Sequence, residues 1–188
     1  GALIGRGTYK GGVGTASITL DNGVVVGALA VVNALGLPFD TSPKQPEPGS
    51  VRLSEGRAST PRVAAASAKA AASENGASAP PPALNTTLVV VATNAILDKA
   101  ECNRTASAAH AGLARALNPS HTLADGDTVF CLATGALALD RSTEAARQAS
   151  LITLQSAAAD VVRLAILDGI DRAEAVSTPA GEFGAYGR

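Results

Sequence analysis

Two strand-like segments joined by a tight turn stand out in the apolar and polar pattern of the chain. Residues 13–20 (VGTASITL) alternate partly and are rich in β-branched side chains. Asp21-Asn22-Gly23 follows, and Asn-Gly between apolar segments is a strong hairpin signal. The returning segment, 24–33, is almost uniformly apolar and ends in Asn33. We therefore predict a β-hairpin whose second strand is central and is covered on both faces.

The pattern is lost between Pro38 and about Leu84. This segment is rich in Pro, Ser, Ala, Lys and Glu and ends in ASAPPPAL. Such a composition buries too little apolar surface to offset the conformational entropy that ordering would cost. Residues 61–72 could form a turn or two of helix, but they have no clear apolar face. We interpret residues 38–84 as a long mobile linker, because long structureless loops in compact domains are usually functional or cleavable.

Regular patterning returns directly after the predicted linker. Residues 86–92 (TTLVVVA) have the length and the β-branched content of a buried strand. Asp98, with Glu101 three residues later, matches a capping box and predicts a helix that runs to about Leu117.

A loop over residues 121–128 (HTLADGDT) precedes a predicted strand at 129–134, and an Ala- and Leu-rich helical region follows at about 142–170. The whole order is a β-hairpin, a linker, and then strand, helix, strand and helix. This order predicts one α/β domain with helices over a mixed sheet.

Length, composition and charge narrow the class of protein. The 188 residues suffice for one compact domain, and with 46% apolar but only 3% aromatic residues the core must consist of small aliphatic side chains. A net charge of −1 makes nucleic-acid binding improbable. We expect no membrane span and a cytoplasmic location, since no stretch reaches the roughly 20 apolar residues of a spanning helix and no secretion signal opens the chain.

The two cysteines, Cys102 and Cys131, lack the paired spacing of a disulfide framework or a zinc site. We interpret them as small buried apolar side chains, with a nucleophilic thiol as the minor alternative. We therefore expect no metal from the cysteines.

The transition from linker to strand falls at Asn85-Thr86. An N-terminal threonine is a complete catalytic unit, because its hydroxyl is the nucleophile and its α-amine, with an ordinary pKa of about 7.7–8.0, is the base. That amine exists only after the preceding peptide bond is cut. The junction is thus a candidate self-cleavage site, with Thr86 as the candidate nucleophile.

Three runs of residues together point to one family. The run NTTLVVVATNAILDKAECNRTASAAHAGLARALNPSHTLADGDTVFCLATG resembles the second half of the self-processing aminopeptidases, which include D-aminopeptidases, β-peptidyl aminopeptidases and 6-aminohexanoate-oligomer (nylon) hydrolases. KGGVGTAS (10–17) and VGALAVVNALG (26–36) resemble the family's strands upstream of the cleavage site. The resemblance implies a layered helix–sheet–sheet–helix sandwich, also found in ornithine acetyltransferases, that is cleaved into associated fragments 1–85 and 86–188.

The resemblance also implies roles for individual residues. Thr86 matches the nucleophile and Asn85 the residue before the scissile bond. The side-chain amide of Asn33 matches an oxyanion-hole donor, and Lys10 a lysine close to the nucleophile. The remaining matched positions form an acidic pair that orients the new amine and hydroxyl: Asp125 and Asp127.

Elementary chemistry is compatible with these roles. A buried amide such as that of Asn33 needs hydrogen-bond partners, and an oxyanion is one. An ammonium at Lys10 would disfavour protonation of the Thr86 amine. Two carboxylates two positions apart, at Asp125 and Asp127, could hold an amine and a hydroxyl in fixed geometry.

Each residue also has an ordinary alternative. Asn33 could cap a strand, Lys10 could be a solvated surface lysine, and Asp125-Gly126-Asp127 could be a turn. A calcium loop is disfavoured because further regularly spaced ligands are absent. The glycines after Lys10 do not form a phosphate loop, because the lysine precedes them. His110 is expected to pack on its helix and His121 to hold the loop.

The resemblance implies hydrolysis of small peptides or amino-acid amides, without a metal or organic cofactor, by an oligomer of the processed chain. Nylon-oligomer hydrolysis, an acyltransferase of the ornithine type and an inactive fragment are the alternatives. Family members carry a longer N-terminal segment that includes an active-site tyrosine, and neither Tyr9 nor Tyr186 lies in that context. We therefore expect this chain to be shortened at its N-terminus relative to the family.

Overall fold

The computed structural model of the chain describes residues 3–38 and 85–187. Residues 39–84, which contain nearly all of the predicted linker, lie outside the described residues. The elements are β1 (Leu3–Ile4), β2 (Tyr9–Lys10), β3 (Val13–Thr19), β4 (Val25–Val31), β5 (Leu37–Pro38), β6 (Leu88–Ala95), α1 (Lys99–Ala109), α2 (Ala111–Ala116), β7 (Leu117–Asn118), β8 (Thr128–Leu137), α3 (Glu144–Asp171), β9 (Val176–Thr178) and β10 (Gly181–Phe183).

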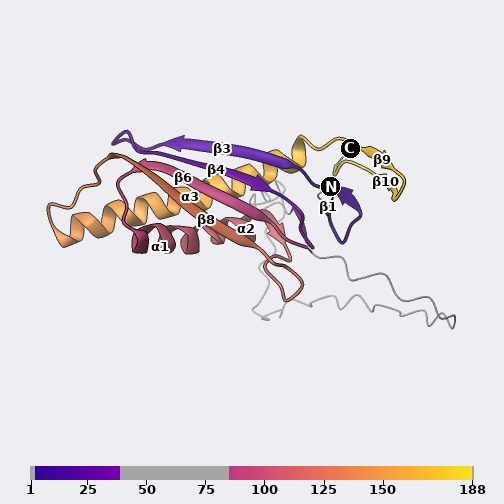
Figure 1. The fold of residues 1–188 in the computed structure, drawn as a ribbon, viewed down its shortest axis with the longest axis horizontal. Helices are drawn as coiled ribbons and strands as arrows, with labels where there is room; N and C mark the ends of the chain where they lie inside the picture. Colours follow the sequence, from indigo (N-terminus) through magenta and orange to yellow (C-terminus); the bar gives the residue numbers. More distant parts are fainter. Residues whose placement is uncertain (1–2, 39–84, 188) are drawn as a thin grey trace, which may run out of the picture. The chain divides into compact units, whose positions relative to one another are not determined.

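A four-stranded mixed sheet in the order β3-β4-β6-β8 forms the centre of the fold (Figure 1). The first two pairs are antiparallel, and β6 and β8 run parallel. One row of the register crosses the sheet from Gly14 through Ala30 and Val89 to Val129. The predicted mixed sheet is confirmed, and β6 joins strands from both sides of the 39–84 segment.

The first predicted hairpin is confirmed. Strands β3 and β4 pair along their whole length, and their bounds fall within two residues of the prediction. In the turn, Gly23 has a φ of +80°, which favours glycine. The Asn22 side chain accepts the Val24 N–H at 3.1 Å and closes the turn.

The predicted capping box at the start of α1 is present. The Asp98 carboxylate accepts the Glu101 N–H at 2.7 Å, and the Glu101 carboxylate accepts the Asp98 N–H at 3.1 Å. Arg141 binds both carboxylate oxygens of Glu101 at 2.8 Å and is the largest cause of the lowered pKa of that group. The single helix predicted to run to about Leu117 is wrong in one respect: it breaks at His110 into α1 and α2.

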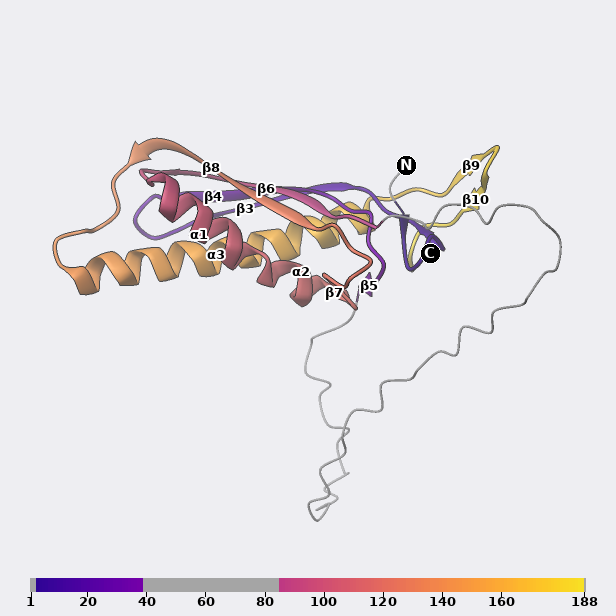
Figure 2. The same cartoon turned by 60° about the horizontal axis from the view of Figure 1, so that its bottom comes forward.

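The three described helices, α1, α2 and α3, lie on one side of the central sheet (Figure 2). The core lies between them and consists of aliphatic side chains such as Val26, Val91, Leu113 and Ile166. Helix α3 approaches β3 so closely that a Cβ on Gly14 would lie 2.1 Å from the Gly169 nitrogen. Among the described helices, α3 is long and apolar enough to cross a membrane, but its buried face packs in this core.

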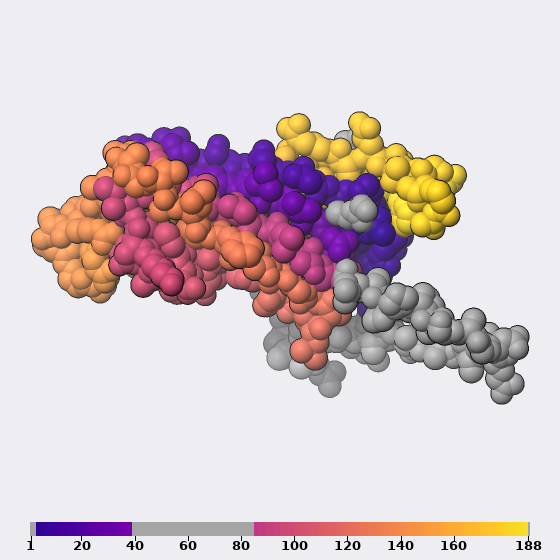
Figure 3. Space-filling view, viewed as in Figure 1, coloured from indigo at the N-terminus to yellow at the C-terminus, as the bar shows by residue number. Residues whose placement is uncertain are grey.

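The other face of the sheet carries exposed apolar side chains. Leu29, Val90 and Phe130 lie in one row across the register and are 43%, 41% and 58% exposed. Segments far apart in the sequence, coloured from indigo to orange, lie side by side on the surface drawn in Figure 3. The prediction that the 24–33 strand is covered on both faces is therefore wrong for the described residues. The described residues form one four-stranded sheet, three two-stranded sheets and one helical layer. A second large sheet and a second helical layer, as in the predicted sandwich, are not made by this part of the chain.

Candidate active site

Asn85 and Thr86 immediately precede β6, between the end of β4 and the loop that leads into β8. Asn85 is buried and forms an isolated parallel bridge with Asp125. The Thr86 N–H donates to the carbonyl oxygen of Asn33 at 2.5 Å. Residues far apart in the sequence therefore meet at the candidate cleavage site.

The carbonyl group between Asn85 and Thr86 is held by two donors. The Thr86 hydroxyl donates to the Asn85 carbonyl oxygen at 2.6 Å. The backbone N–H of Gly126 donates to the same oxygen at 2.9 Å. The candidate nucleophile thus lies next to the carbonyl group that it would attack, and a backbone donor faces the oxygen where charge would develop.

Gly126 lies at the candidate site, and the sequence analysis does not single it out. A Cβ at this position would lie 2.9 Å from the Thr86 Oγ, closer than real Cβ contacts allow. Glycine therefore lets the loop approach the nucleophile and present its N–H to Asn85. The DGD motif was a signal for this position, but we interpreted its glycine only as part of a turn.

The amide of Asn33 is oriented by the β1 strand. Its Oδ1 accepts the N–H of Leu3 at 3.0 Å. This bond identifies the oxygen end of the amide, so the Nδ2 group is the donor end and points away from that N–H. The backbone carbonyl of Asn33 therefore binds the Thr86 N–H, and the Asn33 side-chain amide is held in one orientation by Leu3.

The two carboxylates of the DGD motif bind backbone around the junction. Asp127 is buried and accepts the Thr87 N–H at 2.7 Å and the His121 N–H at 3.1 Å. Asp125 accepts the Leu35 N–H at 3.3 Å, and its other oxygen accepts the backbone and hydroxyl of Thr122.

Within the described residues, neither carboxylate hydrogen-bonds to Thr86 in the uncut chain. Both acidic residues lie at the junction and bind backbone groups there. Their roles toward the new amine stay predictions.

Lys10 lies in a neighbouring hairpin. It pairs with Leu3 across β1 and β2, its N–H donates to Gly184 at 2.8 Å, and its Nζ lies 3.4 Å from the Gly11 carbonyl oxygen. Leu3 in turn connects it to Asn33. Lys10 is thus linked to the Asn33 amide through a single residue, Leu3. Its effect on the Thr86 amine stays a prediction.

Two histidine rings contact each other at a tilted angle beside Asp127. The His110 and His121 ring centroids lie 4.9 Å apart, and His121 Nδ1 is 3.5 Å from an Asp127 oxygen. Burial lowers the pKa of His110, with a further lowering from His121 and an opposing effect of Asp127. His110 also sits at the break between α1 and α2, so it joins the helical layer to the active-site loop.

Both cysteines are half-buried, so the expectation that they are buried side chains is wrong. Burial, together with contact with Cys102, raises the pKa of the Cys131 thiol to about 12. A thiol with such a pKa holds almost no thiolate at neutral pH and is a poor nucleophile. No group of three or more His, Cys, Asp or Glu side chains suited to a metal ion occurs among the described residues.

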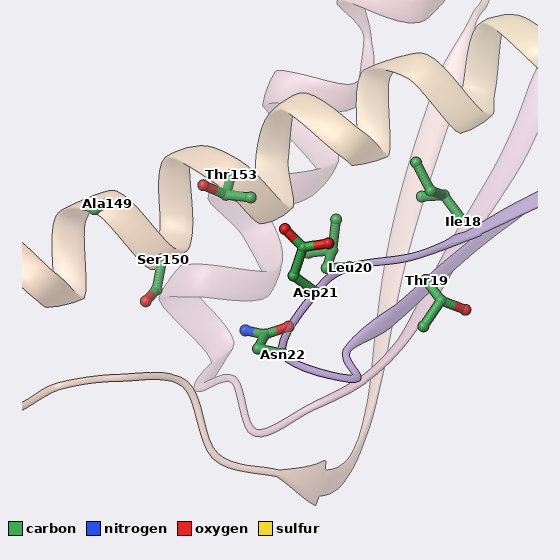
Figure 4. A pocket seen from close by; sticks show the side chains of 8 residues that line it. All are labelled: Ile18, Thr19, Leu20, Asp21, Asn22, Ala149, Ser150 and Thr153. Atoms are coloured by element: carbon green, nitrogen blue, oxygen red, sulfur yellow. The ribbon is translucent and has the colours of Figure 1, made fainter.

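A cavity of about 430 Å³ lies away from this junction. The turn after β3 and the first turns of α3 line it (Figure 4). The register puts this turn at the end of the sheet opposite Leu88, two residues after Thr86. The junction is therefore the candidate active site because of its geometry, and this cavity is not part of it.

Comparison with known proteins agrees with the geometry. Residues 1–183 match Peptidase family S58. An uncharacterized aminopeptidase of Mycobacterium tuberculosis is 43% identical over 91% of this chain and 51% of its own length. An uncharacterized aminopeptidase of Mycobacterium leprae is 42% identical over 100% of this chain and 53% of its own. The chain thus spans about half the length of these relatives.

Two solved structures share the fold. A Burkholderia sp. β-aminopeptidase has a TM-score of 0.61 at 20% identity and covers 100% of this chain and 48% of its own. The L-aminopeptidase D-Ala-esterase/amidase of Ochrobactrum anthropi, described as a variant of the Ntn hydrolase fold, has a TM-score of 0.63 at 22% identity, over 98% of this chain and 47% of its own. With the family match over nearly the whole chain, these findings confirm the resemblance: the chain belongs to peptidase family S58.

Proposed function

We propose that this chain carries the self-processing nucleophile of an aminopeptidase and that Thr86 is that nucleophile. The observation that supports this most strongly is the shared oxygen of Asn85, which accepts the Thr86 hydroxyl at 2.6 Å and the Gly126 N–H at 2.9 Å. The attacking group and an oxyanion donor are therefore both in place in the uncut chain.

Self-cleavage begins when the Thr86 Oγ attacks the carbonyl carbon of Asn85. The C–N bond breaks, the hydroxyl proton passes to the leaving nitrogen, and an ester joins Asn85 to the Thr86 side chain. Water then hydrolyses the ester, which leaves a carboxylate on Asn85 and a free α-amine on Thr86. During the attack, the Gly126 N–H stabilises the negative charge on the carbonyl oxygen.

Amide hydrolysis repeats this chemistry on a substrate. The Thr86 amine accepts the hydroxyl proton as Oγ attacks the substrate carbonyl, and it gives the proton to the leaving amine. The acyl group stays on Thr86 until water releases it. The oriented amide of Asn33 donates to the oxyanion, while Asp125 and Asp127 hold the loop and the strand start in position.

The two fragments stay associated in this proposal. Strand β4 belongs to residues 1–85 and β6 to residues 86–188, and the two pair in register from Val26–Thr93 to Val31–Leu88. Cutting the chain before β6 leaves this ladder and the core unchanged. Fragments 1–85 and 86–188 are therefore expected to co-elute under native conditions, as one protomer of an oligomer.

Small peptides or amino-acid amides are the proposed substrates, because the relatives named above are aminopeptidases. The test compares hydrolysis of amino-acid p-nitroanilides by Thr86→Ser and Thr86→Val. Serine keeps the hydroxyl, so it should retain self-cleavage and turnover. Valine has the same shape without the hydroxyl and should abolish both. Turnover by Thr86→Val at the wild-type rate would contradict the proposal. Nylon oligomers belong in the same substrate panel.

A further inference from the structure

Two short hairpins form a wall beside the candidate active site. Strand β1 pairs with β2, and β9 pairs with β10 (Figures 1 and 2). The hairpins are joined by the Lys10 N–H, which donates to Gly184 at 2.8 Å. The rings of Tyr9 and Tyr186 add an edge-to-face contact with centroids 5.3 Å apart. The C-terminal segment is thus fixed to β2, whose partner strand β1 contacts Asn33 through Leu3.

A small apolar pocket lies between these hairpins. Its volume is about 240 Å³, and its lining consists of Leu3, Lys10, Val176, Thr178, Ala180 and Phe183. Pockets that hold a whole drug-sized ligand measure roughly 300–1,000 Å³. This pocket is therefore suited to one apolar side chain rather than to a complete ligand.

The pocket is connected to the nucleophile through Leu3. The Leu3 N–H donates to Asn33 Oδ1 at 3.0 Å, and the Leu3 carbonyl oxygen accepts the Ala34 N–H at 2.9 Å. Asn33 in turn accepts the Thr86 N–H at 2.5 Å. Leu3, which lines the pocket, is thus hydrogen-bonded to Asn33, and Asn33 is hydrogen-bonded to Thr86.

We propose that this pocket binds the side chain of the substrate residue whose carbonyl Thr86 attacks, and that it selects amides of amino acids with apolar side chains such as leucine or phenylalanine. The inference rests on the proposed function. Four apolar side chains favour an apolar occupant, because removing apolar surface from water is favourable. The Lys10 ammonium at the wall disfavours a cationic side chain by like-charge repulsion.

The test uses the full chain and measures kcat/KM for the p-nitroanilides of alanine, leucine, phenylalanine and lysine. Wild type should prefer leucine and phenylalanine over lysine. Ala180→Leu adds bulk inside the pocket, so the leucine-to-alanine ratio of kcat/KM should fall about 10-fold or more, the scale of a mismatch of a few methylenes. Ser177→Leu adds bulk to the same hairpin at a residue that does not line this pocket, and it should keep the ratio.

A second measurement separates this inference from the proposed function. Free leucine, a hydrolysis product, is titrated into the protein, and backbone NMR shifts are followed at Phe183 and Ser177. Shifts confined to Phe183 and its pocket, weakened by Ala180→Leu, support the pocket whether or not an amide is hydrolysed. The pocket assignment would be overturned if Ala180→Leu and Ser177→Leu had the same leucine-to-alanine ratio of kcat/KM. It would also be overturned if free leucine shifted neither the Phe183 nor the Ser177 signal. In both cases self-cleavage at Asn85 could still proceed. Absence of any turnover would contradict the proposed function instead.

Discussion

The backbone N–H of Gly126 donates a hydrogen bond of 2.9 Å to the carbonyl oxygen of Asn85. This bond joins the loop before β8 to Asn85, in the segment that leads into β6. It also puts a fixed donor on the carbonyl group at which the chain is proposed to be cut. Several consequences of this geometry can be measured.

Replacing Gly126 by alanine should slow self-cleavage by about 10²-fold, since displacement of a reacting group by roughly 1 Å costs this much. The added Cβ would lie 2.9 Å from the Thr86 Oγ and must displace the hydroxyl or the loop. The rate is measured from the appearance of the 86–188 fragment on denaturing gels.

Gly27→Ala is the matched control. Its Cβ would have its nearest neighbour at 3.6 Å, which is ordinary contact. It should therefore cleave at the wild-type rate. Equal rates for both glycine variants would show that the approach of Gly126 to Thr86 is unimportant.

Asn33→Asp separates the two functions of the Asn33 side chain. The aspartate keeps an oxygen that can accept the Leu3 N–H, but it loses the donor that is proposed to face the oxyanion. We expect the amide-hydrolysis rate to fall by about 10²–10³-fold, as for loss of one oxyanion donor. Melting curves followed by circular dichroism check that the fold persists. Hydrolysis at a near wild-type rate would exclude Asn33 as the donor.

Asp127→Ala should lower the free energy of unfolding by about 2–3 kcal/mol, because it removes a buried charged acceptor from two backbone N–H groups. These donors belong to Thr87 and His121. Urea denaturation gives the value. Asp160→Ala removes an exposed carboxylate paired with Arg115 and should cost less than about 1 kcal/mol. If Asp127→Ala and Asp160→Ala lowered the free energy of unfolding by similar amounts, Asp127 would not stabilise the junction through its two backbone hydrogen bonds.

The half-buried imidazole of His110 should make stability depend on mild acid. Burial lowers its pKa below the ordinary 6.5, so the unfolded chain binds this proton more readily than the folded chain. The free energy of unfolding should therefore fall as the pH drops below 6.5.

His110→Gln removes this titration. Urea midpoints compared from about pH 7.5 to about pH 5.5 should fall more for wild type than for the variant. Parallel curves would mean that His110 does not control this dependence.

Local signals in the sequence predicted much of the fold. The Asn22-Gly23 turn and the Asp98–Glu101 capping box depend on residues within four positions of each other, and both are present. The break at His110 was not predictable from helical periodicity, since α1 and α2 both continue the apolar spacing. The open face of β4 also escaped prediction, because a uniformly apolar strand does not specify what covers it.

The candidate site was predictable only in part. The junction at Asn85-Thr86 and the acidic loop were visible as motifs and as a family resemblance. The contacts that join them are long-range: Thr86 reaches back to Asn33, and Gly126 reaches back to Asn85. The first pairing follows from the antiparallel register of β4 and β6 and the second from the parallel register of β6 and β8, and no single strand encodes either register.

The most direct test of the central claim is the intact mass of the purified protein under denaturing conditions. Self-processing predicts two species, residues 1–85 and residues 86–188, whose masses sum to that of the whole chain plus one water. Thr86→Val should give a single uncut chain. A wild-type protein that stays uncut after prolonged incubation, or one that is cut at another bond, would contradict the assignment of Thr86 as the self-generated nucleophile.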